Sequence, residues 1–190
     1  MKSDGQKMRM NVKKLALIAI LTSVALIIFI IEAQIPLPIP IPSVKLGLAN
    51  AVTLFALFLS RNDKDDVKKA DTDFINVTLT NVDAFAILVS RIILGAVFTG
   101  RFLAFAYSIT GGVLGFIAQV LMKRFVSRKQ IWVCGAIGAV FHNIGQIFAA
   151  VVITGTPAII VYLPALIIAG IVTGVITGLI AQMTIERISL

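Results

Sequence analysis

Six long apolar runs, separated by short polar or basic segments, dominate this chain and decide what it can fold into. An α-helix rises 1.5 Å per residue, so about 20 apolar residues cross roughly 30 Å of hydrocarbon. The runs are close to this length and are continuous, whereas a membrane β-barrel would show short segments of alternating polarity. They predict an all-α, polytopic membrane protein with six transmembrane helices, at about 15–31, 44–60, 82–99, 102–122, 131–153 and 159–183.

The composition supports this class of protein and excludes a water-soluble domain. Of the 190 residues, 58% are apolar and only 14% are charged, and the mean hydropathy is +1.00. Soluble domains contain about 45–50% apolar and about 25% charged residues. The same composition excludes a disordered chain. The single cysteine, Cys134, cannot form an internal disulfide, and its apolar surroundings suggest a small packing residue.

The basic residues are distributed unevenly between the two sides of the predicted bundle. One side carries five Lys or Arg in 1–14, four in the polar loop 61–81, four in 123–130 and one in the tail 184–190. The other side carries two, Lys45 and Arg101. Because cytoplasmic segments are enriched in Lys and Arg, this bias predicts a multi-pass protein of the cell membrane with both termini cytoplasmic. The net charge of +8 is explained by topology, so we expect no nucleic-acid partner.

Proline occupies every second position of the first external loop, at Pro36, Pro38, Pro40 and Pro42. This spacing forbids a helix and imposes an extended, polyproline-like path. The residues between the prolines are apolar, so the loop should lie on or in the membrane surface. It is either a rigid interfacial linker or a lid over an external cavity.

Three polar side chains lie close together in the fifth predicted span. Gly138, His142 and Gln146 are four residues apart and share one helical face, which Asn143 borders. Polar groups in a span face the bundle or a cavity, because lipid offers no hydrogen-bond partners. Interhelical hydrogen bonding would explain one such residue, but three within five residues favour a binding role. A lone His without Cys or carboxylates at ligand spacing gives no reason to expect a metal site.

Arg91 lies near the middle of the third span, where a charge costs about 2.5–3.5 kcal/mol and must face inward. No acidic residue lies within one helical turn, so its partner is another helix, water or an anionic ligand. Lys45 and Asn50 lie at the external end of the second span. Cations outnumber anions in this half of the bundle, which favours an anionic or phosphorylated ligand. For Lys45, snorkelling to the membrane surface is the alternative.

Small residues mark two helix faces that can approach another helix closely. The sixth span carries Gly170, Gly174 and Gly178, for which packing inside the bundle is the default expectation. The first span carries Ala19 and Ser23 at the same spacing, with Ala16 beside them.

Several segments of the chain together resemble a known family. They are Lys45–Asn50 (KLGLAN), Arg91–Gly95 (RIILG), Tyr107–Gly112 (YSITGG), Gly138–Gln146 (GAVFHNIGQ) and Tyr162–Pro164 (YLP). They are similar to the Gx transporter family, also labelled heptaprenyl diphosphate synthase component I, and to the S components of energy-coupling-factor (ECF) transporters.

The resemblance implies a compact S-component-like bundle that captures a small-molecule ligand from the external side. It implies that the external proline loop covers the ligand and that Ala16, Ala19 and Ser23 face a membrane coupling subunit. Separate ATPases would supply energy. The polar and charged side chains described above give the expected ligand-binding residues, which are Lys45, Asn50, Arg91, His142, Asn143 and Gln146.

Two other functions stay open at this point. The chain could be a non-catalytic membrane subunit of a flavin- or quinone-linked electron-transfer system, or an accessory component of prenyl diphosphate metabolism. No phosphate-binding loop of ATPases is present, and the aspartates of 61–81 lack the spacing of the prenyl-synthase motif. We therefore expect no catalytic activity and no bound cofactor in this chain.

Overall fold

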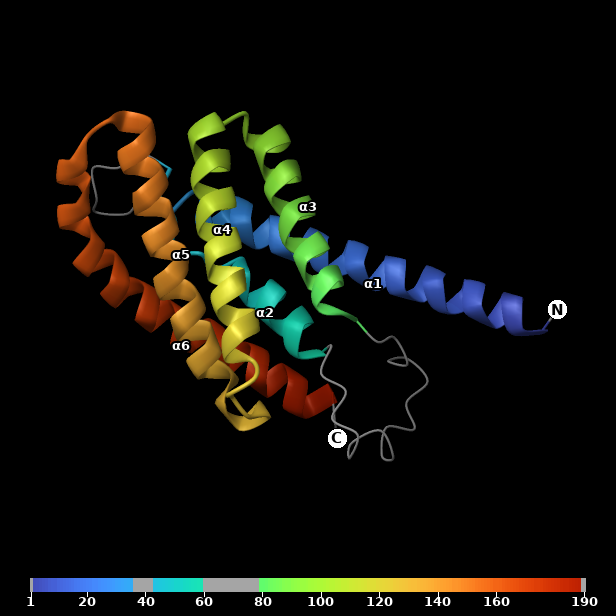
Figure 1. The fold of residues 1–190 in the computed structure, drawn as a ribbon. Coiled ribbons are helices and arrows are strands. Elements are labelled where there is room, and N and C mark those ends of the chain that lie inside the picture. The colour runs from blue at the N-terminus through green and yellow to red at the C-terminus, as the bar shows by residue number, and fades with distance from the viewer. Residues whose placement is uncertain (1, 36–42, 60–78, 189–190) are drawn as a thin grey trace.

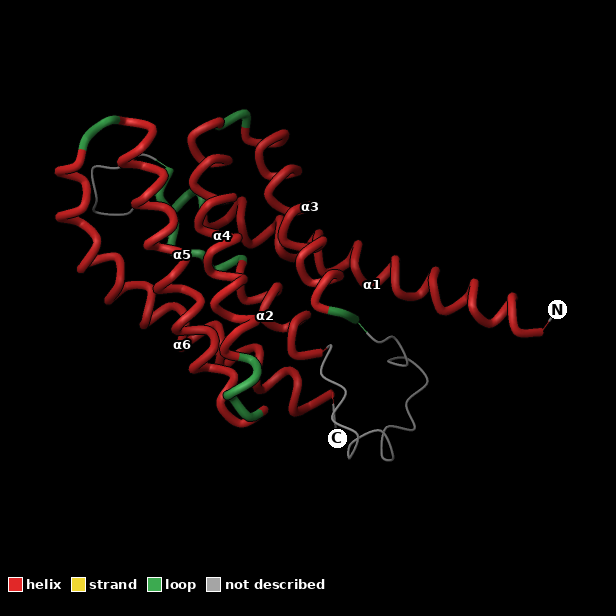
Figure 2. Tube along the Cα trace, viewed as in Figure 1, coloured by secondary structure: helices red, strands yellow, loops and turns green. Residues whose placement is uncertain are grey.

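The computed structural model describes residues 2–35, 43–59 and 79–188, and within these ranges the chain is helical without any strand (Figures 1 and 2). The prediction of an all-α fold is confirmed. The α-helices of the described residues are α1 (Lys2–Glu32), α2 (Asn50–Leu59), α3 (Asn81–Thr99), α4 (Phe102–Met122), α5 (Ile131–Thr154) and α6 (Leu163–Ile188). Short 3-10 helices, η1 (Arg128–Gln130) and η2 (Pro157–Tyr162), precede α5 and α6.

Five helices in the described part of the chain are long and apolar enough to cross a membrane: α1 from Val12, α3, α4, α5 and α6. The remaining expected span, 44–60, differs from the prediction. Its helical part, α2, has 10 residues and extends about 15 Å, too short to cross a bilayer alone. The chain before it is not helical, because the backbone of Gly47 has a φ of +82° and the preceding N–H groups bond to side chains of other helices.

α2 lies at the centre of the bundle and contacts each of the other α-helices (Figure 1). α5 packs most extensively against α4 and α6, and α1 packs against α3. The α5–α6 contact depends on glycine: a Cβ on Gly174 would lie 2.6 Å from the carbonyl oxygen of Gly135, closer than real atoms approach. The glycine face predicted in the sixth span therefore packs against α5 inside the bundle.

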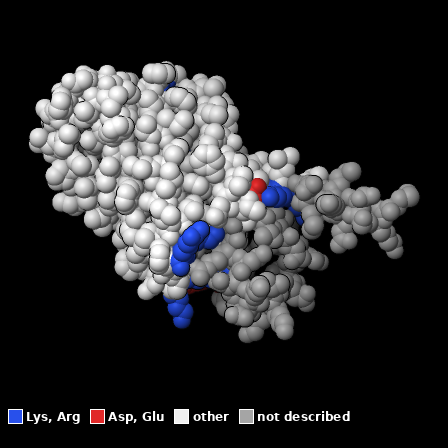
Figure 3. Space-filling model, in the orientation of Figure 1, with Lys and Arg blue, Asp and Glu red and all other residues white. Residues whose placement is uncertain are grey.

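The two ends of the bundle differ in charge. At one end, which we call the basic end, Lys14 forms an ion pair of 2.7 Å with Asp83, and Thr80 and Asp83 form a capping box at the start of α3. Lys123 Nζ donates to the carbonyl oxygen of Leu57 at 2.6 Å, joining the ends of α4 and α2. In Figure 3 the upper part of the visible face is nearly free of charge, and charged side chains gather on the lower part. The expected ligand-binding residues lie away from the basic end, around the segment where α1 ends and α2 begins and beside the middle of α3 and α5.

Candidate functional site

The non-helical segment before α2 is held by a carboxylate from α1. Glu32, the last residue of α1, accepts hydrogen bonds through Oε1 from the backbone N–H of Gly47 at 2.5 Å and of Leu48 at 3.2 Å. Glu32 is 4% exposed, so these bonds form inside the protein. The carboxyl group lies next to the start of α2, where the helix dipole favours a negative charge. Glu32 thus joins α1 to the beginning of α2.

The same segment is bonded to α5 through a side-chain amide. Gln146 Oε1 accepts from the backbone N–H of Lys45 at 2.9 Å, and Gln146 Nε2 donates to the carbonyl oxygen of Lys45 at 2.6 Å. Gln146 Nε2 also lies 3.3 Å from Asn143 Oδ1, and Asn143 Nδ2 donates to the carbonyl oxygen of Leu166 on α6 at 2.6 Å. Irregular backbone at membrane depth needs such partners, because lipid supplies none. Gln146 and Asn143 therefore hold α2 and α6 to α5.

Two buried cations lie beside this segment. The ammonium of Lys45 stands over the ring of Phe29, with Nζ 3.1 Å from the ring centroid, and it makes no hydrogen bond among the described residues. The guanidinium of Arg91 lies 5.9 Å from the same centroid. Arg91 is 2% exposed; its Nη2 donates to Asn50 Oδ1 at 2.7 Å, and its Nε has no partner in the described part of the chain. The cation–π contact offsets only part of what these charges lose by leaving water.

The charges around these two cations do not balance. Glu32 interacts electrostatically with Arg91 and Lys45, but within the described residues no nitrogen of either lies within 4.0 Å of its carboxylate in an ion pair. Arg101, another cation near this end, is exposed to solvent. We call Phe29, Glu32, Lys45, Asn50 and Arg91 the cationic cluster. It has two buried cations, one carboxylate and unused N–H donors, and it can accept an anion.

His142 lies next to the cationic cluster. It is 3% exposed, and a Cβ added to Gly47 would lie 2.9 Å from its Cδ2 atom, so the imidazole packs directly against the segment before α2. Its backbone and side chain also contact Gly111 and Gly115 of α4. No group of three or more His, Cys, Asp or Glu residues that could hold a metal ion occurs among the described residues.

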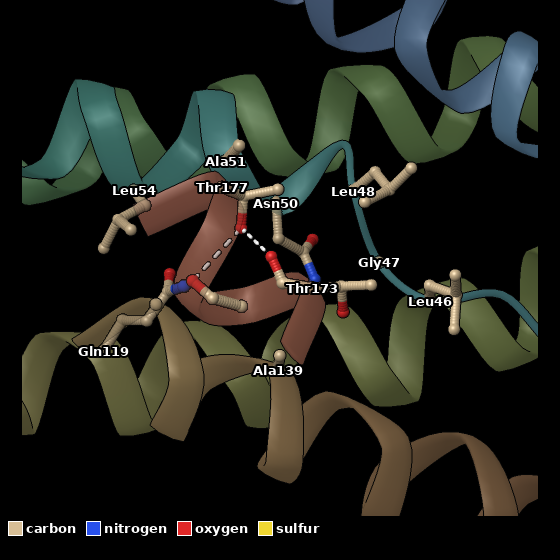
Figure 4. A pocket seen from close by; sticks show the side chains of 12 residues that line it. Leu46, Gly47, Leu48, Asn50, Ala51, Leu54, Gln119, Ala139, Thr173 and Thr177 are labelled. Carbon is tan, nitrogen blue, oxygen red and sulfur yellow. Dashed lines mark hydrogen bonds between the residues drawn. The ribbon is translucent and has the colours of Figure 1, made fainter. Parts of the chain in front are cut away.

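A small pocket lies beside Asn50, between the start of α2, the C-terminal part of α4, the first half of α5 and the middle of α6 (Figure 4). The amides of Asn50 and Gln119 and the hydroxyl of Thr177 line it, and this hydroxyl donates to the carbonyl oxygen of Thr173 at 2.8 Å. The pocket has room for about one water molecule. It is too small for an organic ligand.

The structure brings together most of the residues expected from the sequence. Lys45, Asn50 and Arg91 form the cationic cluster, Gln146 bonds the backbone of Lys45, and His142 packs beside it. Asn143 instead bonds toward α6. The lid prolines, Pro36, Pro38, Pro40 and Pro42, lie outside the described residues. The docking residues Ala16, Ala19 and Ser23 are exposed on α1, although the Ser23 hydroxyl donates to the carbonyl oxygen of Ala19 at 2.9 Å.

Two members of the cationic cluster were missing from the residues expected to bind the ligand. Glu32 gave a usable signal, because an acidic residue at the end of an apolar run needs a partner at membrane depth. Phe29 gave none, since an aromatic residue in an apolar helix most often packs in the core or faces lipid. Phe29 contacts a buried cation only because folding places Lys45, from a different segment, over its ring.

Comparison with protein families gives one match. Residues 21–65 and 74–184 match the family described as heptaprenyl diphosphate synthase component I. The matched ranges contain all five residues of the cationic cluster as well as His142, Asn143 and Gln146. Searches of curated proteins and of solved structures find no match. The matched residues cover most of the chain, which therefore belongs to the heptaprenyl diphosphate synthase component I family.

Proposed function

We propose that this chain is a membrane-embedded substrate-binding subunit of an uptake transporter, similar to an ECF S component. It captures a small ligand with an anionic or strongly polar head group from the external side of the cell membrane. Six membrane-embedded segments, including α2 and the non-helical residues before it, form the bundle, with both termini in the cytoplasm. Energy comes from separate coupling and ATPase subunits.

The observation that carries this proposal is the excess positive charge of the cationic cluster, which has two cations and one carboxylate. Arg91 and Lys45 are buried, and among the described residues Lys45 Nζ and Arg91 Nε have no hydrogen-bond partner, although Arg91 Nη2 donates to Asn50. A buried charge without a partner destabilises a fold by several kcal/mol. Binding of an oppositely charged ligand offsets this penalty. An anionic head group between the two cations supplies this partner.

Exposed residues on α1 support the expected partner subunit. Ala16, Ala19 and Ser23 lie on one side of α1, and no other described helix covers them. Small residues allow a second helix to approach the backbone closely, so this face suits a membrane coupling subunit. The glycines of α6 are not available for this purpose, because α5 already packs against Gly174.

The name of the family favours a second candidate function. It describes one component of a synthase, which suggests a non-catalytic role beside a second component. Co-purification from the native membrane distinguishes the two. Recovery of a membrane coupling subunit with ATPases supports transport, and recovery of a soluble prenyl synthase component supports the accessory role.

Native mass spectrometry of the purified chain tests the proposed ligand. We expect wild type to carry an anionic small molecule, Arg91→Ala to lose it, and the matched variant Arg101→Ala to keep it, because Arg101 is exposed to solvent. A neutral ligand, or equal retention by Arg91→Ala, would contradict the proposal.

Cysteine labelling tests the orientation. In a Cys134→Ser background, single cysteines at 123–130 should be protected from a membrane-impermeant external reagent. External labelling of that turn would show that the orientation is opposite to the one proposed.

A further inference from the structure

Glu32 occupies the place where an anionic ligand would most easily bind. The free N–H groups at the start of a helix, together with the helix dipole, are a common binding site for phosphate and other anions. Here the N–H groups of Gly47 and Leu48, next to the start of α2, already donate to Glu32 Oε1. A ligand that binds the cationic cluster without displacing Glu32 must use other donors.

The donors that remain are few and belong to side chains. Lys45 Nζ makes no hydrogen bond among the described residues, and Arg91 Nε has no partner there. Lys45 Nζ lies 3.1 Å and the guanidinium carbon of Arg91 lies 5.9 Å from the centroid of the Phe29 ring, so both cations lie near the same ring. A carboxylate has two oxygens, and each can accept a charge-assisted hydrogen bond from one of these two donors.

The formal charge leads to the same class of ligand. Lys45 and Arg91 contribute two positive charges and Glu32 contributes one negative charge, while His142 is formally neutral. One positive charge is left. A single carboxylate cancels it, whereas a phosphate or diphosphate brings further negative charge into a buried site without backbone donors to stabilise it.

We propose that the cationic cluster binds one carboxylate group of an organic monoanion, between Lys45 Nζ and Arg91 Nε, and that Glu32 excludes phosphate and diphosphate. The inference depends on the proposed function, because it specifies the anion that the substrate-binding subunit takes. Glu32 is a specificity-determining residue: it removes the helix N-terminus from the site and lowers the net positive charge by one.

The test uses the full chain in phosphatidylcholine nanodiscs, with binding measured by the shift in melting temperature. The probes are acetate, benzoate, inorganic phosphate and pyrophosphate at equal ionic strength. Wild type should be stabilised by acetate or benzoate and not by the phosphates. Glu32→Gln keeps an oxygen that accepts from Gly47 and Leu48 but removes the charge, so it should bind phosphate or pyrophosphate about tenfold more tightly than wild type does.

The matched control is Glu186→Gln, the same chemical change near the C-terminal end of α6, which should keep the wild-type preference. Stronger stabilisation of wild type by phosphate or pyrophosphate than by carboxylates would overturn the inference while leaving an anion-binding subunit in place. If no anion stabilises wild type or Glu32→Gln, both the inference and the anionic ligand of the proposed function are wrong. Should Glu32→Gln fail to fold, the wild-type comparison of carboxylates with phosphates decides.

Discussion

Two sets of buried polar side chains lie close together in this bundle. The side chains of one set have hydrogen-bond partners, and the other set contains nitrogens without a partner. The amides of Asn143 and Gln146 on α5 are bonded to backbone groups of other segments at 2.6–2.9 Å. The cations Lys45 and Arg91 are also buried, yet Lys45 Nζ and Arg91 Nε have no partner in the described residues. Burial alone therefore does not mark a candidate ligand site. Buried donors and charges that lack a partner do.

The physical reason for the difference is the cost of an unpaired group. A buried amide that finds its partners contributes about 0.5–1.5 kcal/mol per hydrogen bond, and it fixes the position of the segment to which it bonds. A buried cation without a partner destabilises the fold as long as no anion is bound. We therefore assign the amides of α5 to the scaffold and the two cations to the proposed binding site.

The strongest test of this comparison removes an amide. Gln146→Ala leaves the N–H and carbonyl groups of Lys45 unpaired, and each buried group without a partner costs about 1–3 kcal/mol. We expect the largest loss of stability among these variants, measured by unfolding in detergent. The control Gln182→Ala removes a half-buried amide that donates to the exposed Glu186 on α6 and bonds no backbone group among the described residues, so it should cost little. Equal losses would mean that Gln146 is not a scaffold residue.

The opposite result is expected for a cation. Arg91→Met loses the hydrogen bond to Asn50 but also removes a buried charge, and the second effect offsets the first, so stability without ligand should be unchanged or higher. Ligand binding should weaken by about tenfold or more, since a charged hydrogen bond contributes about 1.5–3 kcal/mol. Arg91→Lys should restore binding only in part, because a point charge does not replace a planar guanidinium. A variant that melts early but binds normally would assign Arg91 to the scaffold.

A smaller effect sharpens the comparison within α5. Asn143→Ala removes the bond to the carbonyl oxygen of Leu166 and one contact with Gln146, so we expect a loss of about 1 kcal/mol. Ligand specificity should not change, because Asn143 bonds away from the cationic cluster. The check is the melting temperature together with the anion preference of the same sample. A changed preference would place Asn143 in the site, as the sequence pattern alone suggested.

The smallest effect on the isolated chain is expected on the exposed face of α1. Ala19→Trp adds bulk where no described residue packs, so both stability and ligand binding should stay as in wild type. Pull-down of a coupling subunit should be lost, because a large side chain blocks close helix approach. Unchanged pull-down would show that a different face docks the partner or that the protein works alone.

Sequence reasoning located much of the candidate site and could not assign its roles. Arg91 in an apolar span had to face inward, and the spacing of His142 and Gln146 placed them on one helical face. Neither pattern tells which groups pair with each other. Gln146 bonds the backbone of Lys45, 101 residues away, and no periodicity within one helix predicts that contact.

The sequence by itself determined the class of fold. Long apolar runs can bury their backbone hydrogen bonds in lipid only as helices, so an all-α membrane protein follows from composition and run length. The tertiary structure alone decided that α2 starts at Asn50 and that Glu32 occupies the N–H groups before it. The physical reason is that a helix satisfies its own backbone locally, whereas the partners of the non-helical segment and the charge balance of the cationic cluster come from α1, α3 and α5, which only folding brings together.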